Sequence, residues 1–259
     1  MSTSKLVSLA AAALILPCLL PGPCAAKKSE AQSRQAPTEA KPSPGTALPL
    51  TPPTTGPITV ESVFERLSEF DAKMTSLALS FRQTVRLEEG GAPQSKQGTL
   101  VFLKPKRLRL EYLRPEPQTV VSDGRTFWVW RKWINQVIES SFDDWRKNDP
   151  ALEGLLNFGD YASLLRRYDV AVGHAAAAGA DGHRVFRLDL RPKAKDAAFV
   201  LALTMSTRDY FPYEARLTAA GAVVESVFAD VRFNPDLSRS VFDFTPPKDA
   251  DVFRYPTGH

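Results

Sequence analysis

The feature that most constrains this chain of 259 residues is an alternation of apolar and polar side chains that recurs, segment after segment, between residues 77 and 244. Successive side chains of a β-strand point to opposite faces, so each such segment predicts a strand with one face away from water. Predicted strands run from residue 77 to 139 and again from 168 to 244, the last of them at 239–244. Their short connections favour an antiparallel meander, and a sheet of about eleven strands has to curl or close.

Two segments have helical period instead. The first begins after Thr59, a good N-cap, and repeats apolar residues three and four positions apart. The second begins at Asp149-Pro150, an N-cap followed by a proline at the first helical position. A helix that is apolar on one face must bury that face, so we expect both helices to cover the concave side of the sheet as a lid. The predicted lid residues are Val63, Leu67 and Phe70 in the first helix and Leu152, Leu155, Leu156 and Phe158 in the second.

The predicted fold class is therefore mainly β with an α-helical lid. We expect an unclosed antiparallel β-barrel of about eleven strands, covered by an N-terminal helix and a helical insertion. The folded domain is predicted to span residues 58–259.

The N-terminal part of the chain differs from this domain. Residues 1–26 contain Lys5, a short apolar run and an Ala-rich end, which predicts an export signal that is removed after Ala26. Residues 27–57 hold seven prolines and almost no large apolar side chain, so we expect a disordered, solvated linker. The signal predicts that the mature protein is exported.

Both cysteines of the chain, Cys18 and Cys24, lie in the signal segment, so the mature protein would form no disulfide. Cys24 leaves a second interpretation open, because a cysteine at the cleavage point can be acylated in bacterial lipoproteins. The residues in front of it, Pro21-Gly22-Pro23, match the usual pattern poorly. The protein would then be anchored to a membrane through Cys24.

Charge and motifs argue against several classes of function. The formal net charge is +4, of which the signal segment and the linker carry most, so no nucleic-acid surface is indicated. The three histidines show no metal-ligand spacing, and nucleophile elbows, phosphate-binding loops and dinucleotide fingerprints are missing from the sequence. We therefore expect neither an enzyme nor a cofactor or metal site, although a scattered hydrolytic site stays as a remote alternative.

Apolar residues exceed what half-buried strands require. Residues 127–130 are all large and apolar, and the four tryptophans fall between positions 128 and 145. A core cluster explains them; a wall that contacts lipid beneath a movable lid explains them too. The predicted cavity residues are Leu79, Phe81, Val101, Leu103, Leu108, Leu110, Tyr112, Trp128 and Trp130.

Three stretches resemble the LolA family of periplasmic lipoprotein carriers: Gly98-Thr99-Leu100-Val101-Phe102-Leu103-Lys104-Pro105 followed by Leu108-Arg109-Leu110-Glu111-Tyr112, then Val121-Ser122-Asp123-Gly124-Arg125-Thr126-Phe127-Trp128, and finally Phe242-Asp243-Phe244-Thr245-Pro246-Pro247. The resemblance implies an open barrel with a helical lid over an apolar cavity. It also implies acylated lipoproteins as cargo, an inner-membrane ABC lipoprotein-releasing complex and an outer-membrane receptor as partners, and a monomeric carrier.

This sequence departs from the family pattern at one position that matters for the lid. Where the family often has an arginine that is thought to hold the lid closed, this chain has Lys104, which can donate hydrogen bonds but lacks the planar fork. Lys104 is therefore a candidate latch. Two alternatives share the fold: a lipid-anchored outer-membrane receptor that uses Cys24, and a periplasmic sensor of envelope stress.

Overall fold

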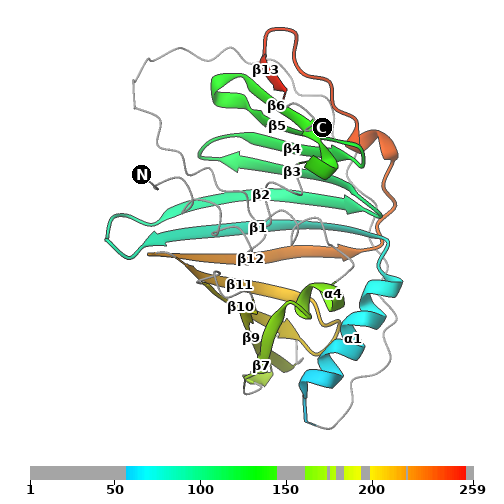
Figure 1. Cartoon of the computed structure of the whole chain (residues 1–259), viewed down its shortest axis with the longest axis vertical. Helices are drawn as coiled ribbons and strands as arrows, with labels where there is room; N and C mark the ends of the chain where they lie inside the picture. The colour runs from blue at the N-terminus through cyan, green and yellow to red at the C-terminus, as the bar shows by residue number, and fades with distance from the viewer. Residues whose placement is uncertain are drawn as a thin grey trace.

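One curved sheet contains most of the regular structure in this computed structural model, which describes residues 57–144, 161–173, 176–178, 184–193, 199–219 and 221–254. The sheet has thirteen strands in the order β13-β6-β5-β4-β3-β2-β1-β12-β11-β10-β9-β7, with β8 paired to β9 (Figure 1). The strands are β1 Ser76–Leu87, β2 Gln94–Leu103, β3 Arg107–Arg114, β4 Gln118–Asp123, β5 Thr126–Arg131, β6 Gln136–Ser141, β7 Tyr168–Val172, β8 Ala176–Ala178, β9 Arg184–Pro192, β10 Phe199–Ser206, β11 Pro212–Ala219, β12 Ala222–Phe233 and β13 Asp251–Arg254.

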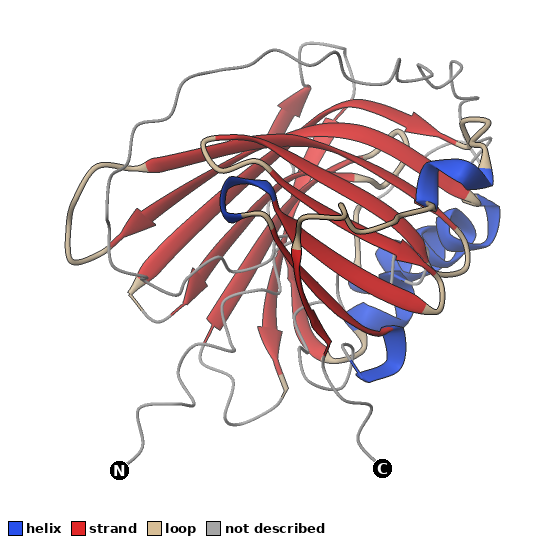
Figure 2. Cartoon of the chain, turned by 90° about the horizontal axis from the view of Figure 1, so that it is seen from above, coloured by secondary structure: helices blue, strands red, loops and turns tan. Residues whose placement is uncertain are grey.

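The sheet is open, because β13 and β7 stand at opposite ends of the strand order and do not pair with each other. It is centred on β1, which pairs with β2 on one side and with β12 on the other. Figure 2 shows that the sheet as a whole is curved and that the longer helices lie together at one side of it. The predicted mainly β, unclosed barrel is confirmed.

Helix α1, Val60–Lys73, precedes the sheet and begins where the sequence predicts. The Thr59 hydroxyl accepts from the Ser62 N–H at 3.2 Å, and the Ser62 hydroxyl accepts from the Thr59 N–H at 3.0 Å. This reciprocal cap satisfies two backbone donors that a helix start otherwise leaves unpaired. The other helical segments used below are the short helix α4, Tyr161–Leu165, and the 3₁₀ turns η1, Lys132–Ile134, and η2, Arg239–Phe242.

The predicted strand at 239–244 is wrong. Its first four residues form η2, where the Ser238 hydroxyl accepts from the Ser240 N–H, and Phe242 is fully buried. Residues 243–250 form no strand, and the Phe244 ring lies against the outer face of the sheet. The strand that does follow, β13, pairs in parallel with β6, so the sheet is antiparallel except at this edge. Local patterning cannot reveal such a pairing, because the partner is more than a hundred positions away.

A single glycine lets two aromatic rings meet in the middle of the sheet. Gly98 of β2 lies between Phe81 of β1 and Tyr112 of β3, whose rings form an edge-to-face pair with centroids 5.4 Å apart. A Cβ atom added to Gly98 would lie 2.0 Å from the Glu111 carbonyl oxygen and 2.7 Å from the Phe81 ring. Only glycine therefore allows this close approach of strands and rings.

We expect Gly98→Ala to lower the free energy of unfolding by about 2–3 kcal/mol, because backbone and ring must both move to accept a methyl group. Denaturant titration of the purified protein measures this change. Gly173→Ala is the matched control, since the nearest atom to its added Cβ is an Arg187 side-chain carbon at 3.3 Å. Equal losses for the two variants would contradict the packing explanation.

Candidate functional site

The inner face of the curved sheet is apolar across most of its strands. Leu79 of β1, Leu100 of β2 and Leu110 of β3 lie opposite one another in register, so they share one face. The residues that form this face in β1 to β5 are at most 5% exposed: Leu77, Leu79, Phe81, Leu100, Phe102, Leu108, Leu110, Tyr112, Val120, Phe127 and Val129. They join side chains of β9 to β12 and α1 in one continuous core cluster.

Five of the predicted cavity residues lie on this inner face: Leu79, Phe81, Leu108, Leu110 and Tyr112. Val101 and Leu103 do not, so their assignment to the same interior is wrong. Val101 lies opposite Arg109, and Leu103 lies opposite Arg107. The strand period puts these four side chains on the outer face.

The tryptophans Trp128 and Trp130 also lie on the outer face, which corrects the prediction that they line the interior. Both rings contact Phe244, with centroids 5.8 and 6.1 Å away. The Trp128 indole N–H donates to Glu139 at 3.2 Å, and the Lys132 ammonium lies 5.1 Å from the Trp130 ring centroid. The surplus of apolar residues in β5 therefore has two causes: Phe127 and Val129 form the inner wall, and the tryptophans bind the C-terminal segment.

Helix α1 closes part of the inner face, as predicted. Val63, Leu67 and Phe70 are at most 2% exposed. The Phe70 ring contacts Phe233 of β12 edge-to-face at 5.4 Å and Tyr161 of α4 at 5.9 Å. The remaining predicted lid residues, Leu152, Leu155, Leu156 and Phe158, lie outside the described residues.

Asp71 joins the two described lid helices. This residue near the end of α1 is buried, and its carboxylate accepts from the Ala162 N–H in the first turn of α4 at 2.9 Å. Burial of the Tyr161 phenol, with the Asp71 charge nearby, raises the pKa of Tyr161, so the phenol stays neutral at physiological pH. A buried carboxylate at a helix N-terminus satisfies an unpaired N–H and also interacts favourably with the helix dipole. No sequence pattern indicates this contact, because the two residues are far apart along the chain.

Lys104 connects the sheet to α1. Its ammonium group donates to the Asp71 carbonyl oxygen in the last turn of the helix, and its backbone N–H donates to the Thr75 carbonyl at 2.9 Å. A cation near the C-terminus of a helix also interacts favourably with the helix dipole. The candidate latch therefore reaches a lid carbonyl with a single ammonium group.

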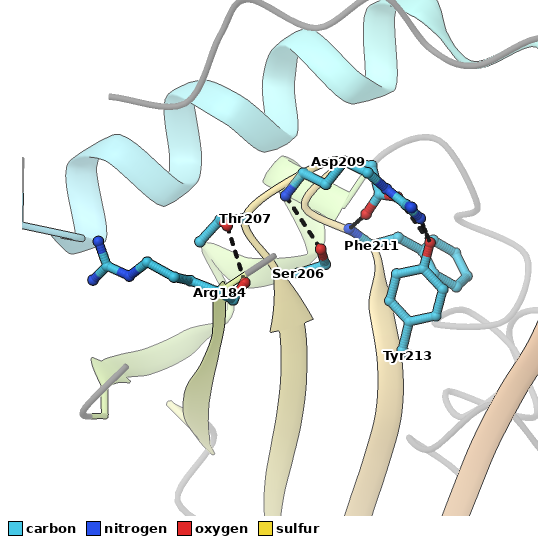
Figure 3. A network of polar contacts seen from close by, with 7 residues as sticks. Arg184, Ser206, Thr207, Asp209, Phe211 and Tyr213 are labelled. Carbon is cyan, nitrogen blue, oxygen red and sulfur yellow. Dashed lines mark hydrogen bonds and ion pairs between the residues drawn. The ribbon is translucent and has the colours of Figure 1, made fainter. Parts of the chain in front are cut away.

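The connection between β10 and β11 forms a polar network beside α1 (Figure 3). Asp209 is buried; its carboxylate accepts from the Tyr213 hydroxyl at 2.8 Å, the Arg208 guanidinium at 3.1 Å and the Phe211 N–H at 3.1 Å. Burial, and then the Asp209 charge, raise the pKa of Tyr213, which keeps the phenol as a hydrogen-bond donor. Sequence reasoning missed this network, whose signal is the polar run Ser206-Thr207-Arg208-Asp209 between two predicted strands.

Tyr210, in the same loop, interacts with Arg66 of α1. Its backbone is left-handed, with φ of 55°, and its ring contacts Phe186 at 5.5 Å. Burial raises the pKa of Tyr210, while the charge of Arg66 of α1 and a hydrogen bond with it work in the opposite direction. The β10–β11 connection is therefore fixed, and one of its side chains meets the lid helix.

Apolar side chains dominate the described interior. No group of three or more His, Cys, Asp or Glu residues within the described ranges could hold a metal ion. None of the helices in the described part of the chain has both the length and the apolar character to cross a membrane.

Fold and site together define a class of protein: an open β half-barrel whose apolar inner face is closed by helices. The model of the family described as outer membrane lipoprotein carrier protein LolA matches residues 72–245, and the chain belongs to this family. The chain is 28% identical to the outer-membrane lipoprotein carrier protein of Dechloromonas aromatica, over 73% of this chain and 86% of that protein. It is 29% identical to the protein of the same name from Ralstonia nicotianae, with the same coverage.

A solved structure agrees on the fold. An uncharacterized conserved protein from Thermus thermophilus has a TM-score of 0.51 at 15% sequence identity, and the match covers 75% of this chain and 98% of that one. At this identity the likeness concerns the arrangement of the chain alone.

We expect Asp71→Ala to lower the free energy of unfolding by about 1–3 kcal/mol, since the N-terminus of α4 loses its buried acceptor. The same variant should become easier to cleave by protease near α4, because the contact that docks this helix on α1 is gone. Asp143→Ala is the control: its side chain is 72% exposed and its ion pair with Lys106 is long, at 3.6 Å. A stable, protease-resistant Asp71→Ala variant would contradict the role of this residue as a junction.

Proposed function

We propose that this protein is a periplasmic carrier that shields the acyl chains of lipoproteins and moves them from the inner to the outer membrane. The observation that carries the proposal is the continuous apolar inner face under α1, in a member of the lipoprotein-carrier family. The proposed mechanism is binding and release without catalysis or a cofactor.

The need for a carrier is physical. Burial of each methylene group from water is worth about 0.8 kcal/mol, so exposing an acyl chain of about sixteen carbons to water costs roughly 13 kcal/mol. A protein that covers the chain removes this barrier. The same protein must also release its guest, so it cannot bind the chain with all of that energy.

Exchange of similar contacts meets both requirements. In the closed form the inner face is covered, and Val63, Leu67 and Phe70 are part of what covers it. An acyl chain that displaces α1 replaces one set of apolar contacts by another, so the net affinity stays modest. Transfer to a receptor with a higher affinity then runs downhill. The proposed partners are acylated lipoproteins, an inner-membrane ABC releasing complex and an outer-membrane receptor, with the carrier acting as a monomer.

We expect Leu108→Gln to reduce uptake of a diacylated lipopeptide at least tenfold, because Leu108 is fully buried in the inner wall and a buried amide there finds no partner on an apolar guest. Fluorescence anisotropy of a labelled lipopeptide measures the uptake. Val227→Gln is the matched control, since Val227 lies on β12 with 48% of its surface exposed. Thermal unfolding is recorded for both variants; a folded Leu108→Gln variant with normal uptake would exclude the inner face as the binding surface.

We expect Lys104→Met to increase the rate at which a bound lipopeptide leaves by about fivefold, because α1 loses one hydrogen bond to the sheet. Stopped-flow displacement by excess unlabelled lipopeptide measures this rate. Lys106→Met, two residues away, removes a lysine that contacts Phe142 and Asp143 instead of α1, and should leave the rate unchanged. An unaltered rate in Lys104→Met, or equal acceleration in both variants, would argue against a latch at Lys104.

A further inference from the structure

Three side chains that can donate hydrogen bonds form a row across β12, β1 and β2 on the mainly apolar inner face. Gln83 of β1 lies directly opposite Ser226 of β12 on one side and Lys96 of β2 on the other. In antiparallel pairs, side chains that lie directly opposite are about 5 Å apart at Cβ, so the three side chains span roughly 10 Å. The name polar row is used below for Ser226, Gln83 and Lys96.

The polar row separates two apolar bands on the same face. One step along the strands towards α1, Phe81 lies opposite Phe228 and Gly98, beside the Tyr112 ring. One step in the other direction, Val85 lies opposite Val224 on one side and Gln94 on the other. A ligand that follows the strands would therefore meet aromatic contacts, then three donors, then aliphatic contacts.

The side chains of the row are buried or half-buried, and other described residues do not satisfy them. Ser226 is 1% exposed, and its hydroxyl has no hydrogen bond within the described residues. Gln83 is 3% exposed, and Lys96, which is half-buried, makes no ion pair with any residue that the structure describes. A buried hydroxyl without a partner is costly, so Ser226, next to two further polar side chains, needs an explanation.

Other buried serines in the same sheet show what the usual solution is. Ser122 lies on the inner face of β4; its hydroxyl donates to the Lys106 carbonyl at 2.9 Å and accepts from the Gly124 N–H at 3.1 Å. The Ser76 hydroxyl donates to the Pro235 carbonyl at 2.8 Å. Local backbone groups satisfy both of these serines, whereas Ser226 lies on the apolar face between strands whose backbone groups are already paired.

The chemistry of the row fits carbonyl oxygens. A hydroxyl, an amide NH₂ and an ammonium group can all donate hydrogen bonds, and the Lys96 ammonium lies on the strand beside the Gln83 amide, which also has an acceptor oxygen. Ester and amide carbonyls are acceptors, and in an acylated cysteine they lie at the point where the alkyl chains begin. On the basis of the proposed function, we propose that the polar row is a subsite that binds the ester and amide carbonyls of the lipid-modified cysteine. The aromatic and aliphatic bands on either side would then hold the alkyl chains.

This subsite gives the carrier a way to distinguish an acylated protein from a bare hydrocarbon. Alkyl chains can pack anywhere on an apolar wall, so they fix neither the depth nor the direction of the guest. Directional hydrogen bonds at one level of the wall do fix them. The row therefore sets the position of the cargo's polar head relative to α1.

The experiment compares two probes on the full chain: a synthetic diacylated lipopeptide and a pyrene-labelled alkane of similar length without carbonyl groups. The variants are Gln83→Leu combined with Ser226→Ala, and separately Lys96→Met. We expect each variant to lower the affinity for the lipopeptide about tenfold and to leave the affinity for the alkane unchanged or higher. The control Thr84→Val changes the neighbouring residue on the outer face of β1 and should alter neither affinity.

Each outcome decides one question. Equal loss of both probes in the variants would show general disruption of the wall and overturn the subsite, as would unchanged affinity for the lipopeptide. Thermal unfolding of every variant separates disruption of the fold from loss of the subsite. If the wild-type protein binds neither probe, the proposed function fails together with the subsite; if it binds the lipopeptide and the variants bind it equally well, the subsite alone fails.

Discussion

The structure depends on the burial of the inner face of the sheet against α1 and the rest of the core. An open sheet of thirteen strands would otherwise present a long apolar surface to water, and exposed surfaces of that kind promote association. Phe70 shows how the contact works: one ring touches aromatic residues of β12 and of α4. The contact is non-directional and proportional to area, which is why the proposed function lets an apolar guest take its place.

The polar contacts that the structure describes join α1 to the sheet, to α4 and to the β10–β11 connection. Lys104 holds the last turn, Asp71 joins α4, and the β10–β11 connection meets the helix through Tyr210. In the proposed function, α1 leaves the sheet when an acyl chain takes the place of its apolar contacts. The strands of the sheet are joined by continuous hydrogen-bond ladders. This division suits a container whose wall stays fixed while its cover moves.

The outer face of the sheet carries charged side chains and a binding surface for the C-terminal segment. Trp128 and Trp130 hold the C-terminal segment through Phe244, and charged side chains such as Arg109 and Glu111 cover the same side of β3. The C-terminal segment then returns as β13 and pairs in parallel with β6. The sheet therefore uses these tryptophans to bind its own chain, and its inner wall is built mainly from leucine, valine and phenylalanine.

Patterning along the chain was enough to predict the kind of elements, their order and the existence of an apolar face. Alternation with a period of two located nearly all the strands, and the spacing of Val63, Leu67 and Phe70 located the lid helix and its buried face. The sequence also carried the motifs of the family, among them Gly98, although the need for glycine there is visible only where Phe81 and Tyr112 meet.

Which face of a doubly apolar strand points inward was settled by packing between strands. Val101 and Leu103 are as apolar as Leu100 and Phe102, so composition could not separate them, and the register with β1 and β3 did. Gln83 interrupts the apolar face in one strand and becomes part of a row once β2 and β12 lie beside it. The physical reason is common to both cases: a strand fixes only the alternation of its side chains, while the neighbours that surround each side come from residues far away in the chain.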